Sequence, residues 1–314
     1  MQEWSSNIDY YKLSEVYSIE KANPEEFAVY ESVYGDKTYN RFAVKHWDLR
    51  MAISLDNPFA NKSSYYWIKD GEVRVGGVLL EPNVLSRLFI IPPFTNLYEI
   101  LKLLKNILVN WSDSNKDVYA YQISPEQFDC FEMLGFWPDK SRRWMMRPTE
   151  VFNYAWDKNI SIKAPEVCNC EEIARLFYDS FREGIDTQYT TMHNGQGSTY
   201  EDYLDEVNAY FEECSDDILR EASTLIYNKL ENKLIGACLV SCLEEWPLVH
   251  TIAVDSSYRG MHLAANMLKK ALTVLNSNYP VLRLFVTVGN IAESVYYELG
   301  FIPGVEFKKF YLPR

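Results

Sequence analysis

Short apolar runs and segments with a helical apolar period alternate along the first half of the chain. The runs at 65–68 and 73–80 flank a Lys-Asp-Gly-Glu turn and predict a β-hairpin. Apolar residues recur with a helical period over 97–111 and predict an amphipathic helix. The other elements expected here are a helix that begins at Asn23-Pro24, a helix over 38–54, strands over 85–91 and 118–123, and a helix over 125–134 that ends at Gly135.

The second half repeats this order of elements. A first strand is expected over 160–162, and Ser198-Thr199-Tyr200-Glu201 is a capping box that predicts a helix reaching about residue 213. The remaining elements are a helix over 171–181, a hairpin of strands over 225–228 and 234–242, a strand over 248–254, a helix over 263–275, a strand over 282–288, and a helix over 291–299 that ends at Gly300.

Landmark residues also recur in the same order and at nearly constant spacing. They are Leu134-Gly135-Phe136 against Leu299-Gly300-Phe301, Ile91 against Val254, and Gly77 against Gly236. Constant spacing of landmarks indicates a duplication. The sequence therefore predicts two domains of one fold, over residues 1–155 and 156–314.

Composition narrows the class of protein. The chain has 314 residues, of which 47% are hydrophobic, so a sizeable core is expected. Its 44 acidic residues exceed its 31 basic ones, and a net charge of −13 argues against a nucleic-acid partner. Neither a leader pattern nor an apolar stretch long enough for a membrane is visible, so we expect a soluble, cytoplasmic protein without a membrane partner. The six cysteines contain no Cys-x-x-Cys pair and the four histidines are scattered, so neither a disulfide framework nor a metal site is expected.

Residues 248–265 run from a predicted buried strand through a short turn into a helix. The first backbone N–H groups of such a helix lack intrahelical partners and lie at its positive end, which suits a pyrophosphate. Small residues at Gly260, Ala264 and Ala265 leave room for a ligand beside the backbone, and Arg259 adds positive charge. A strand–turn–helix with one Arg-Gly pair is common, so the pattern alone also fits an ordinary structural turn.

Two motifs in the second half resemble those of the GNAT superfamily of acetyl-CoA-dependent N-acyltransferases. The run Arg259-Gly260-Met261-His262-Leu263-Ala264 resembles the family's Arg/Gln-x-x-Gly-x-Gly/Ala motif, with His262 where glycine is usual. The run from Asn290 to Gly300-Phe301 resembles its later motif, one residue short. The resemblance implies an α/β (α+β) fold of two modules, each with a mixed, mostly antiparallel central sheet flanked by helices.

The resemblance also implies direct acyl transfer from acetyl-CoA to an amine, without an acyl-enzyme. Both substrates would bind between two splayed strands, here 248–254 and 282–288. Backbone N–H groups near Ile252 and Val254 would hold the pantetheine arm and polarise the thioester carbonyl. The residues expected to bind acetyl-CoA are Ile252, Ala253, Val254, Arg259, Gly260, Met261, His262, Leu263, Ala264 and Asn290.

A tyrosine is the acid that the family motif implies for the departing thiolate. Counting back from Gly300 places it at Tyr296, whereas counting forward from Asn290 places it at Tyr297. A helix end capped by glycine is the better reference, so we favour Tyr296.

For the base that removes the ammonium proton we expect His250, the only titratable side chain in its strand. Strand alternation places it with Leu248, Ile252 and Val254. Glu244, Glu245 or no dedicated base are the alternatives.

His262 departs from the family motif and affects the cofactor site. If the position requires a positive φ, a residue other than glycine costs about 1–2 kcal/mol. If it lies in ordinary helix, the side chain only takes room beside the pyrophosphate. In both cases we expect weakened or re-angled cofactor binding rather than its loss.

The segment 199–217 contains eight acidic residues and neither lysine nor arginine. Tyrosines are interleaved with this acidic region, at Tyr189, Tyr200, Tyr203 and Tyr210. A solvated helix face is the simpler interpretation, and an acidic, aromatic rim that attracts a cationic amine is the functional one.

The first repeat lacks the residues that the motifs supply. The sequence Ile91-Pro92-Pro93 begins the turn where the arginine and glycines are expected, and the prolines have no N–H for a phosphate. Phe131 stands where the second repeat has Tyr296. We therefore expect a degenerate first module without activity.

Taken together, these features predict an acyl-CoA-dependent N-acyltransferase that transfers acetyl from acetyl-CoA to a primary amine of a small molecule or peptide. A non-catalytic CoA-binding or interaction protein of the same fold is the alternative. A longer acyl or aminoacyl donor is a third interpretation, and the acceptor amine and the oligomeric state stay open.

Overall fold

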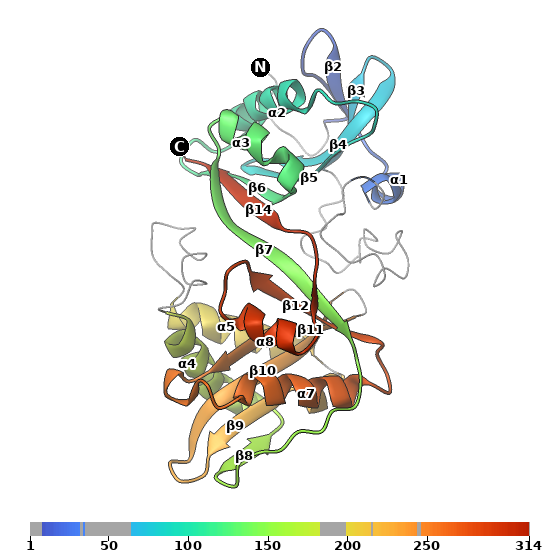
Figure 1. Cartoon of the computed structure of the whole chain (residues 1–314). Coiled ribbons are helices and arrows are strands. Elements are labelled where there is room, and N and C mark those ends of the chain that lie inside the picture. Colours follow the sequence, from blue (N-terminus) through green and yellow to red (C-terminus); the bar gives the residue numbers. More distant parts are fainter. Residues whose placement is uncertain are drawn as a thin grey trace. The chain divides into compact units, whose positions relative to one another are not determined.

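The computed structural model describes residues 8–31, 34, 64–182, 199–214, 216–243 and 246–313. The chain divides into two compact units, of which unit 1 comprises Met1–Arg142 with Gly304–Arg314 and unit 2 comprises Arg143–Pro303 (Figure 1). The two units are not consecutive segments of the chain, because the last strand in the sequence belongs to unit 1. The duplication into two domains over residues 1–155 and 156–314 stays a prediction. The helix expected over 38–54 lies outside the described residues.

Unit 1 is built on a sheet in the order β1-β2-β3-β4-β5-β6-β14-β7. Its strand pairs are antiparallel except for the parallel pair of β5 and β6. Its strands are β1 (Tyr10–Lys12), β2 (Tyr17–Lys21), β3 (Tyr65–Asp70), β4 (Val73–Glu81), β5 (Val84–Ile90), β6 (Val118–Ile123), β7 (Trp137–Pro148, continuing into unit 2) and β14 (Phe307–Leu312), and its helices are α1 (Pro24–Tyr30), α2 (Leu97–Trp111), the 3-10 turn Pro125–Gln127 and α3 (Phe128–Met133).

Unit 2 has a sheet in the order β8-β9-β10-β11-β12-β7, and β13 pairs with β7. Here too the neighbours β11 and β12 are parallel. Its further strands are β8 (Ile160–Lys163), β9 (Thr224–Asn228), β10 (Lys233–Leu243), β11 (Trp246–Val254), β12 (Val281–Thr287) and β13 (Ile302–Pro303), and its helices are the 3-10 turn Val167–Asn169, α4 (Cys170–Phe181), α5 (Tyr200–Glu213), α6 (Asp217–Ala222), the 3-10 turn Ser256–Tyr258, α7 (Leu263–Leu275) and α8 (Ala292–Glu298).

The repeated order of elements predicted from the sequence is confirmed. The series β3-β4-β5-α2-β6-α3 in unit 1 has the same order as β9-β10-β11-α7-β12-α8 in unit 2. Gly236 pairs with Val254, and the corresponding pair in unit 1 is Gly76 with Ile90. The sequence landmarks match Gly236 with Gly77 and Val254 with Ile91. The pairing of the strands shows that the corresponding residues in unit 1 lie one position earlier.

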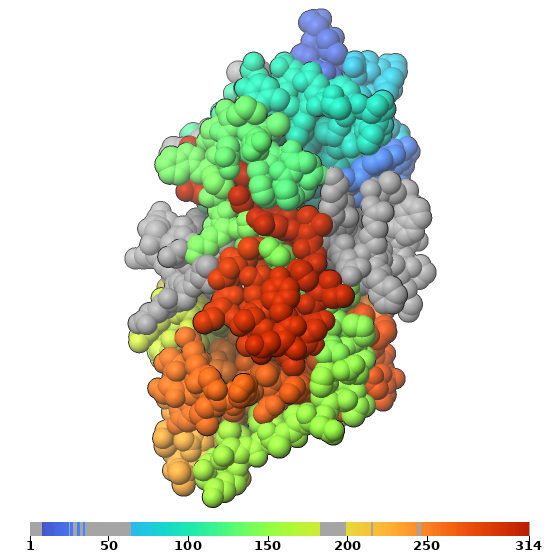
Figure 2. Space-filling model, in the orientation of Figure 1, coloured from blue at the N-terminus to red at the C-terminus, as the bar shows by residue number. Residues whose placement is uncertain are grey.

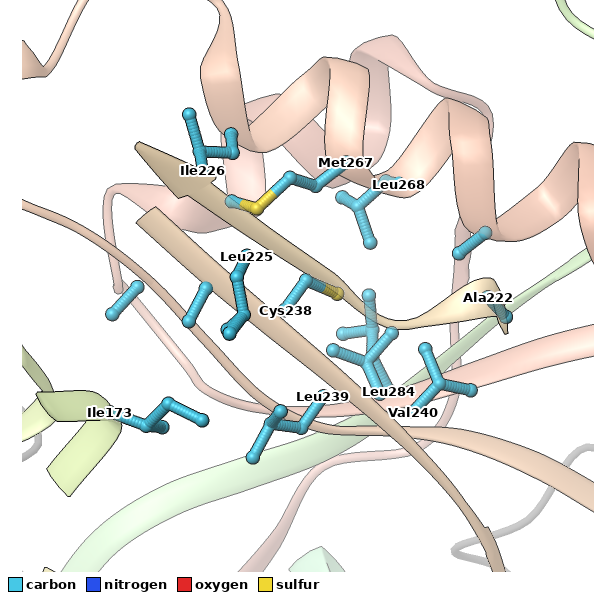
Figure 3. Close-up of a cluster of buried hydrophobic side chains, with 14 of the residues drawn as sticks. Ile173, Ala222, Leu225, Ile226, Cys238, Leu239, Val240, Met267, Leu268 and Leu284 are labelled. Carbon is cyan, nitrogen blue, oxygen red and sulfur yellow. The ribbon is translucent and has the colours of Figure 1, made fainter. Parts of the chain in front are cut away.

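The core of unit 2 lies on both faces of its sheet. Met267 and Leu268 of α7 lie on one side of β9 and β10, and Ile173 of α4 lies on the other (Figure 3). Because both faces are covered, β10 is an almost continuous apolar run instead of an alternating one. These helices hold the strands of unit 2 that carry the candidate site.

The start of α5 differs by one residue from the prediction. Its N-cap is Thr199, whose hydroxyl accepts the N–H of Asp202 at 3.2 Å, while the Asp202 carboxylate accepts the N–H of Thr199 at 2.7 Å. The sequence from Thr199 fits a capping box as well as the one from Ser198 does, and helix geometry selects the later of the two.

Candidate active site

The strands β11 and β12 separate to form a fork. Their parallel pairing ends at Val249 and Leu284, although both strands continue beyond this pair. Val249 and Leu284 are buried in the core. Because side chains alternate along a strand, the next residues, His250 and Phe285, project from the opposite face at the start of the fork.

A β-bulge interrupts β11 at His250. The register between β10 and β11 shifts between Leu239 and Val240, so His250 has no partner of its own. His250 and Thr251 consequently project to the same side, and both reach Glu206 of α5. The alternation expected along this strand therefore does not hold across the bulge.

His250 lies beside α5 with 25% of its side chain exposed. Its Nε2 is 3.5 Å from Oε1 of Glu206, its Nδ1 is 3.5 Å from Oγ of Ser241, and its ring centroid is 5.7 Å from that of Tyr210. Burial lowers the pKa of the imidazole from its ordinary value, and the carboxylates of Glu206 and Glu213 oppose that effect. A neutral imidazole of this kind can accept a proton at neutral pH.

The end of β11 directs backbone amides into the fork. The N–H of Asp255 donates to the carbonyl of Ile235 in β10 at 2.9 Å. Alternate residues of an antiparallel pair bond to the partner strand, so Ala253 also bonds to β10, whereas the amides of Ile252 and Val254 point to the opposite edge. That edge borders the fork, where a strand-like ligand has two amides with which to pair.

The turn after β11 has two residues with positive φ. Gly260 has φ +80°, and His262, the N-cap of α7, is left-handed with φ 56° and ψ 20°. The amides of Leu263 and Ala264 lie in the first turn of α7 and have no intrahelical acceptor. Within the described chain the His262 side chain makes no capping hydrogen bond to them. A Cβ placed on Gly260 meets no described atom within 4 Å, so the turn is open on that side. His262 therefore adopts a positive φ, the costlier of the two cases expected from the sequence.

Arg259 lies exposed in the same turn, and the neighbouring Met261 is also exposed. The guanidinium of Arg259 donates to the carbonyl of Ser180 near the end of α4 at 3.1 Å. It therefore ties the turn to α4. The segment around α7 (orange) and the segment around α8 (red) lie on the same face of unit 2 (Figure 2).

Tyr296 and Tyr297 follow one another on α8 and differ in exposure, at 6% and 47%. The ring of Tyr296 packs edge-on against Phe301 with centroids 6.1 Å apart, and its carbonyl accepts the N–H of Phe301 at 2.9 Å. Packing therefore fixes the orientation of Tyr296, as a positioned acid requires.

Asn290 caps α8. Its side-chain oxygen accepts the N–H of Ala292 at 2.9 Å, and its carbonyl accepts the N–H of Glu293 at 2.9 Å. The carboxylate of Glu293 in turn accepts the N–H of Gly289 at 2.7 Å. These bonds give Asn290 a structural role, and its contact with acetyl-CoA stays a prediction.

The tyrosines of the acidic segment do not all belong to a rim. Tyr210 is buried, and its hydroxyl lies 2.9 Å from Oγ of Ser223, so its inclusion in an exposed aromatic rim is wrong. Tyr203 stacks on Phe181 with ring centroids 6.0 Å apart. Tyr189 lies outside the described residues. The helical period of α5 buries Tyr210, which composition alone does not indicate.

The sequence does not predict Phe285 as part of the site, and it includes Glu206 only within the possible acidic rim as a whole. Glu206 is one of eight acidic residues in its segment, and only the bulge in β11 distinguishes it. Phe285 is exposed and packs against Trp144 of β7, with ring centroids 5.0 Å apart. The expected alternatives for the base, Glu244 and Glu245, lie outside the described residues.

Unit 1 has an ion pair at the corresponding bulge. The register of β4 against β5 also shifts, near Arg87, whose φ is 54°. The Arg87 guanidinium donates to both carboxylate oxygens of Glu31, at 2.9 and 3.0 Å. Two consecutive prolines, Pro92 and Pro93, follow β5 and have no N–H groups, so these two positions of the turn cannot donate to a phosphate.

Comparison with known proteins relates part of the sequence of unit 2 to a family. Residues 179–301 match the model of the acetyltransferase (GNAT) family. A GCN5-related N-acetyltransferase from Sphaerobacter thermophilus aligns over 96% of both chains, with a TM-score of 0.66 and 12% identity. A GNAT-family acetyltransferase from Colwellia psychrerythraea aligns over 94% of this chain and 99% of its own, with a TM-score of 0.52 and 11% identity.

A third similar structure is the GCN5-related glucosamine N-acetyltransferase region of a fungal multi-domain GH3 beta-N-acetylglucosaminidase. It aligns over 95% of this chain and 38% of its own, with a TM-score of 0.58 and 10% identity. At these identities the similarity is one of fold. A search of curated proteins returned no match for the chain.

Residues 179–301 therefore belong to a GNAT acetyltransferase domain, and the predicted fold class is confirmed. Acyl transfer to amine-bearing substrates is the general activity of this class. None of the described helices is long and apolar enough to cross a membrane. The described residues also contain no cluster of three His, Cys, Asp or Glu side chains that could hold a metal ion, and the six cysteines are free thiols.

Proposed function

We propose that unit 2 transfers an acetyl group from acetyl-CoA directly to a primary amine of a small molecule or peptide. The fork between β11 and β12 carries this proposal, because pairing ends at Val249 and Leu284. Beyond that point the amides of Ile252 and Val254 face the open edge. The family supports acyl transfer in general, and the donor and acceptor are inferred from the fork and its surroundings.

The turn before α7 fits the pyrophosphate of acetyl-CoA. Open space beside Gly260 and the left-handed His262 leave the amides of Leu263 and Ala264 at the positive end of the helix dipole. When bound, acetyl-CoA supplies an activated thioester. The full set of residues proposed to hold it is Ile252, Ala253, Val254, Arg259, Gly260, Met261, His262, Leu263, Ala264 and Asn290.

Two side chains handle protons in this proposal. His250 accepts the proton of the ammonium group, because burial holds its pKa below the ordinary value and keeps it neutral near pH 7. Tyr296 supplies a proton to the leaving sulfur, since packing against Phe301 holds its ring on α8. The proposed transfer is direct and involves no covalent enzyme intermediate.

The surroundings of His250 favour a cationic acceptor. Glu206 and Glu213 of α5 both act on the imidazole through their charge. The aromatic rings of Phe285 and Trp144 stand at the start of the fork. Carboxylates attract an ammonium group by Coulomb forces, and aromatic faces add a cation–π contribution.

A paired binding and turnover experiment tests the function. Calorimetry with acetyl-CoA is expected to show binding to the full chain, and CoA release is expected to depend on an added primary amine. His250→Gln and Tyr296→Phe are expected to retain binding and lose turnover, whereas Tyr297→Phe retains both. Binding without amine-dependent turnover would instead identify a non-catalytic CoA-binding protein.

A further inference from the structure

We propose that Glu206 is the positioning residue of His250, holding the Nε2 side of the imidazole so that Nδ1 is the proton-accepting nitrogen. This inference rests on the proposed function, since it assigns His250 the role of base. It concerns a residue that neither the family match nor the sequence motifs single out.

The bulge in β11 brings three side chains together. His250 and Thr251 project to the same side because the register shifts beside them. The Thr251 hydroxyl donates to Oε1 of Glu206 at 2.7 Å, and the same oxygen lies 3.5 Å from Nε2 of His250. The bulged segment of β11 therefore carries both His250 and Thr251, and Thr251 orients the Glu206 carboxylate beside the imidazole.

Nε2 of His250 is buried and has no hydrogen-bond partner among the described residues. A buried ring N–H without an acceptor is unfavourable, and Glu206 is the acceptor at hand. Catalytic hydrogen bonds are often long before substrate binds and shorten in the complex. The geometry therefore favours the tautomer with its proton on Nε2, which leaves Nδ1, beside Oγ of Ser241, free of a proton.

The groups that face His250 come from α5 and β10. Glu206 and Glu213 of α5 are the charged groups in the described chain that act on it, and both favour its protonated form. Tyr210 of α5 and Ser241 of β10 also face the ring and are uncharged at neutral pH. Of the two carboxylates, Glu206 is the one within 4 Å of the imidazole.

When His250 takes the ammonium proton on Nδ1, the amine gains a lone pair and the imidazole becomes a cation with a proton on each nitrogen. The Glu206 carboxylate then accepts the Nε2 proton in a charge-assisted hydrogen bond. Glu206 thereby stabilises the protonated base without itself touching the acceptor. If the charge of Glu206 is removed, the His250 ring stays buried but loses a carboxylate that favours its protonated form. The pKa of His250 is then lowered further.

The test is an NMR titration of the His250 ring in the full chain, with Glu206→Gln as the variant and Glu212→Gln as the control. Glu212 is an exposed carboxylate on the same helix, so the control removes an equal charge away from the ring. In the wild type we expect the neutral ring to carry its proton on Nε2. Glu206→Gln is expected to lower the titration midpoint by about one pH unit, and Glu212→Gln to leave it unchanged.

Kinetics provide the second readout. With Glu206→Gln, the acidic limb of kcat/KM is expected to move to lower pH with its plateau reduced about tenfold or more, and acetyl-CoA affinity is expected to be unchanged. Equal midpoints in wild type and Glu206→Gln, or a neutral ring with its proton on Nδ1, would overturn the role of Glu206. If the NMR results are as expected but His250→Gln keeps full activity, His250 is not the base. The proposed mechanism is then wrong, although the pairing of Glu206 with His250 is correct.

Discussion

Phe131 of unit 1 and Tyr296 of unit 2 occupy the same place in the two repeats. Each lies on a short helix, one turn before a glycine of positive φ, namely Gly135 and Gly300. Each ring packs edge-on against the phenylalanine that follows the glycine, with centroids 5.2 and 6.1 Å apart. The side chains differ by one hydroxyl group, so only unit 2 has a group that can donate a proton at this place.

This relationship predicts the effect of Tyr296→Phe. Unit 1 accommodates phenylalanine at the corresponding place, so the variant is expected to fold with an unchanged Tm. Loss of a general acid is expected to lower kcat roughly a hundredfold without changing the Kd of acetyl-CoA. Steady-state kinetics and calorimetry measure these quantities. Tyr297→Phe is the matched control, and a larger loss there than at Tyr296 would reverse the assignment.

The environment of His250 predicts a pH dependence of the wild-type enzyme. Burial lowers the pKa of His250 below its ordinary value of 6.5, and the base acts in its neutral form. The kcat/KM value is therefore expected to fall as the pH drops through a midpoint below 6.5, and to be level above it. A rate profile between pH 5 and 8 measures this limb. A midpoint above 6.5 would contradict a buried imidazole as the base.

The left-handed backbone of His262 predicts a gain in stability on His262→Gly. At φ 56° a side chain costs about 1–2 kcal/mol, and the greater freedom of glycine in the unfolded chain offsets about 0.5–1 kcal/mol of this gain. A net increase of about 0.5–1 kcal/mol in the free energy of unfolding is expected by denaturant titration. Ala265→Gly in the first turn of α7 is the control, where glycine is expected to destabilise by up to about 1 kcal/mol. Destabilisation by both variants would show that the His262 side chain makes a favourable contact.

The cofactor turn predicts the effect of Gly260→Val. Valine strongly disfavours φ +80°, so the turn is expected to change its backbone and displace the amides of α7. The Kd of acetyl-CoA is expected to rise at least about tenfold, the equivalent of 1.4 kcal/mol. Gly71→Val in the β3–β4 turn of unit 1, at φ +56°, imposes a similar strain away from the site. Calorimetry that shows equal weakening by both variants would indicate a general loss of folding rather than a cofactor site.

Local signals in the sequence predict much of the fold. The helix over 97–111 and the strand over 118–123 have the bounds of α2 and β6, because an amphipathic period and flanking polar residues define each of them. Glycine at Gly135 and Gly300 marks two helix ends correctly, since both have positive φ.

Features that depend on distant pairing are not predicted. The strand β14 lies between β6 and β7 of unit 1, although it is the last strand in the sequence, and its short run Phe-Lys-Lys-Phe-Tyr-Leu gives no sign of these two partners. The bulge at His250 arises from the register of β11 against β10, which the sequence of β11 alone does not contain. For the same reason Glu206 cannot be distinguished from its acidic neighbours before α5 is placed against the sheet.

The most direct test of the account is the rate of CoA release from acetyl-CoA by the full chain, with cationic and neutral primary amines compared as acceptors. Amine-dependent release is expected, faster for cationic acceptors, with the acetyl group found on the amine by mass spectrometry. Tyr296→Phe and His250→Gln are expected to lose this turnover. Turnover that is equal in wild type and both variants, or acetyl-CoA binding with no amine-dependent release, would contradict the account.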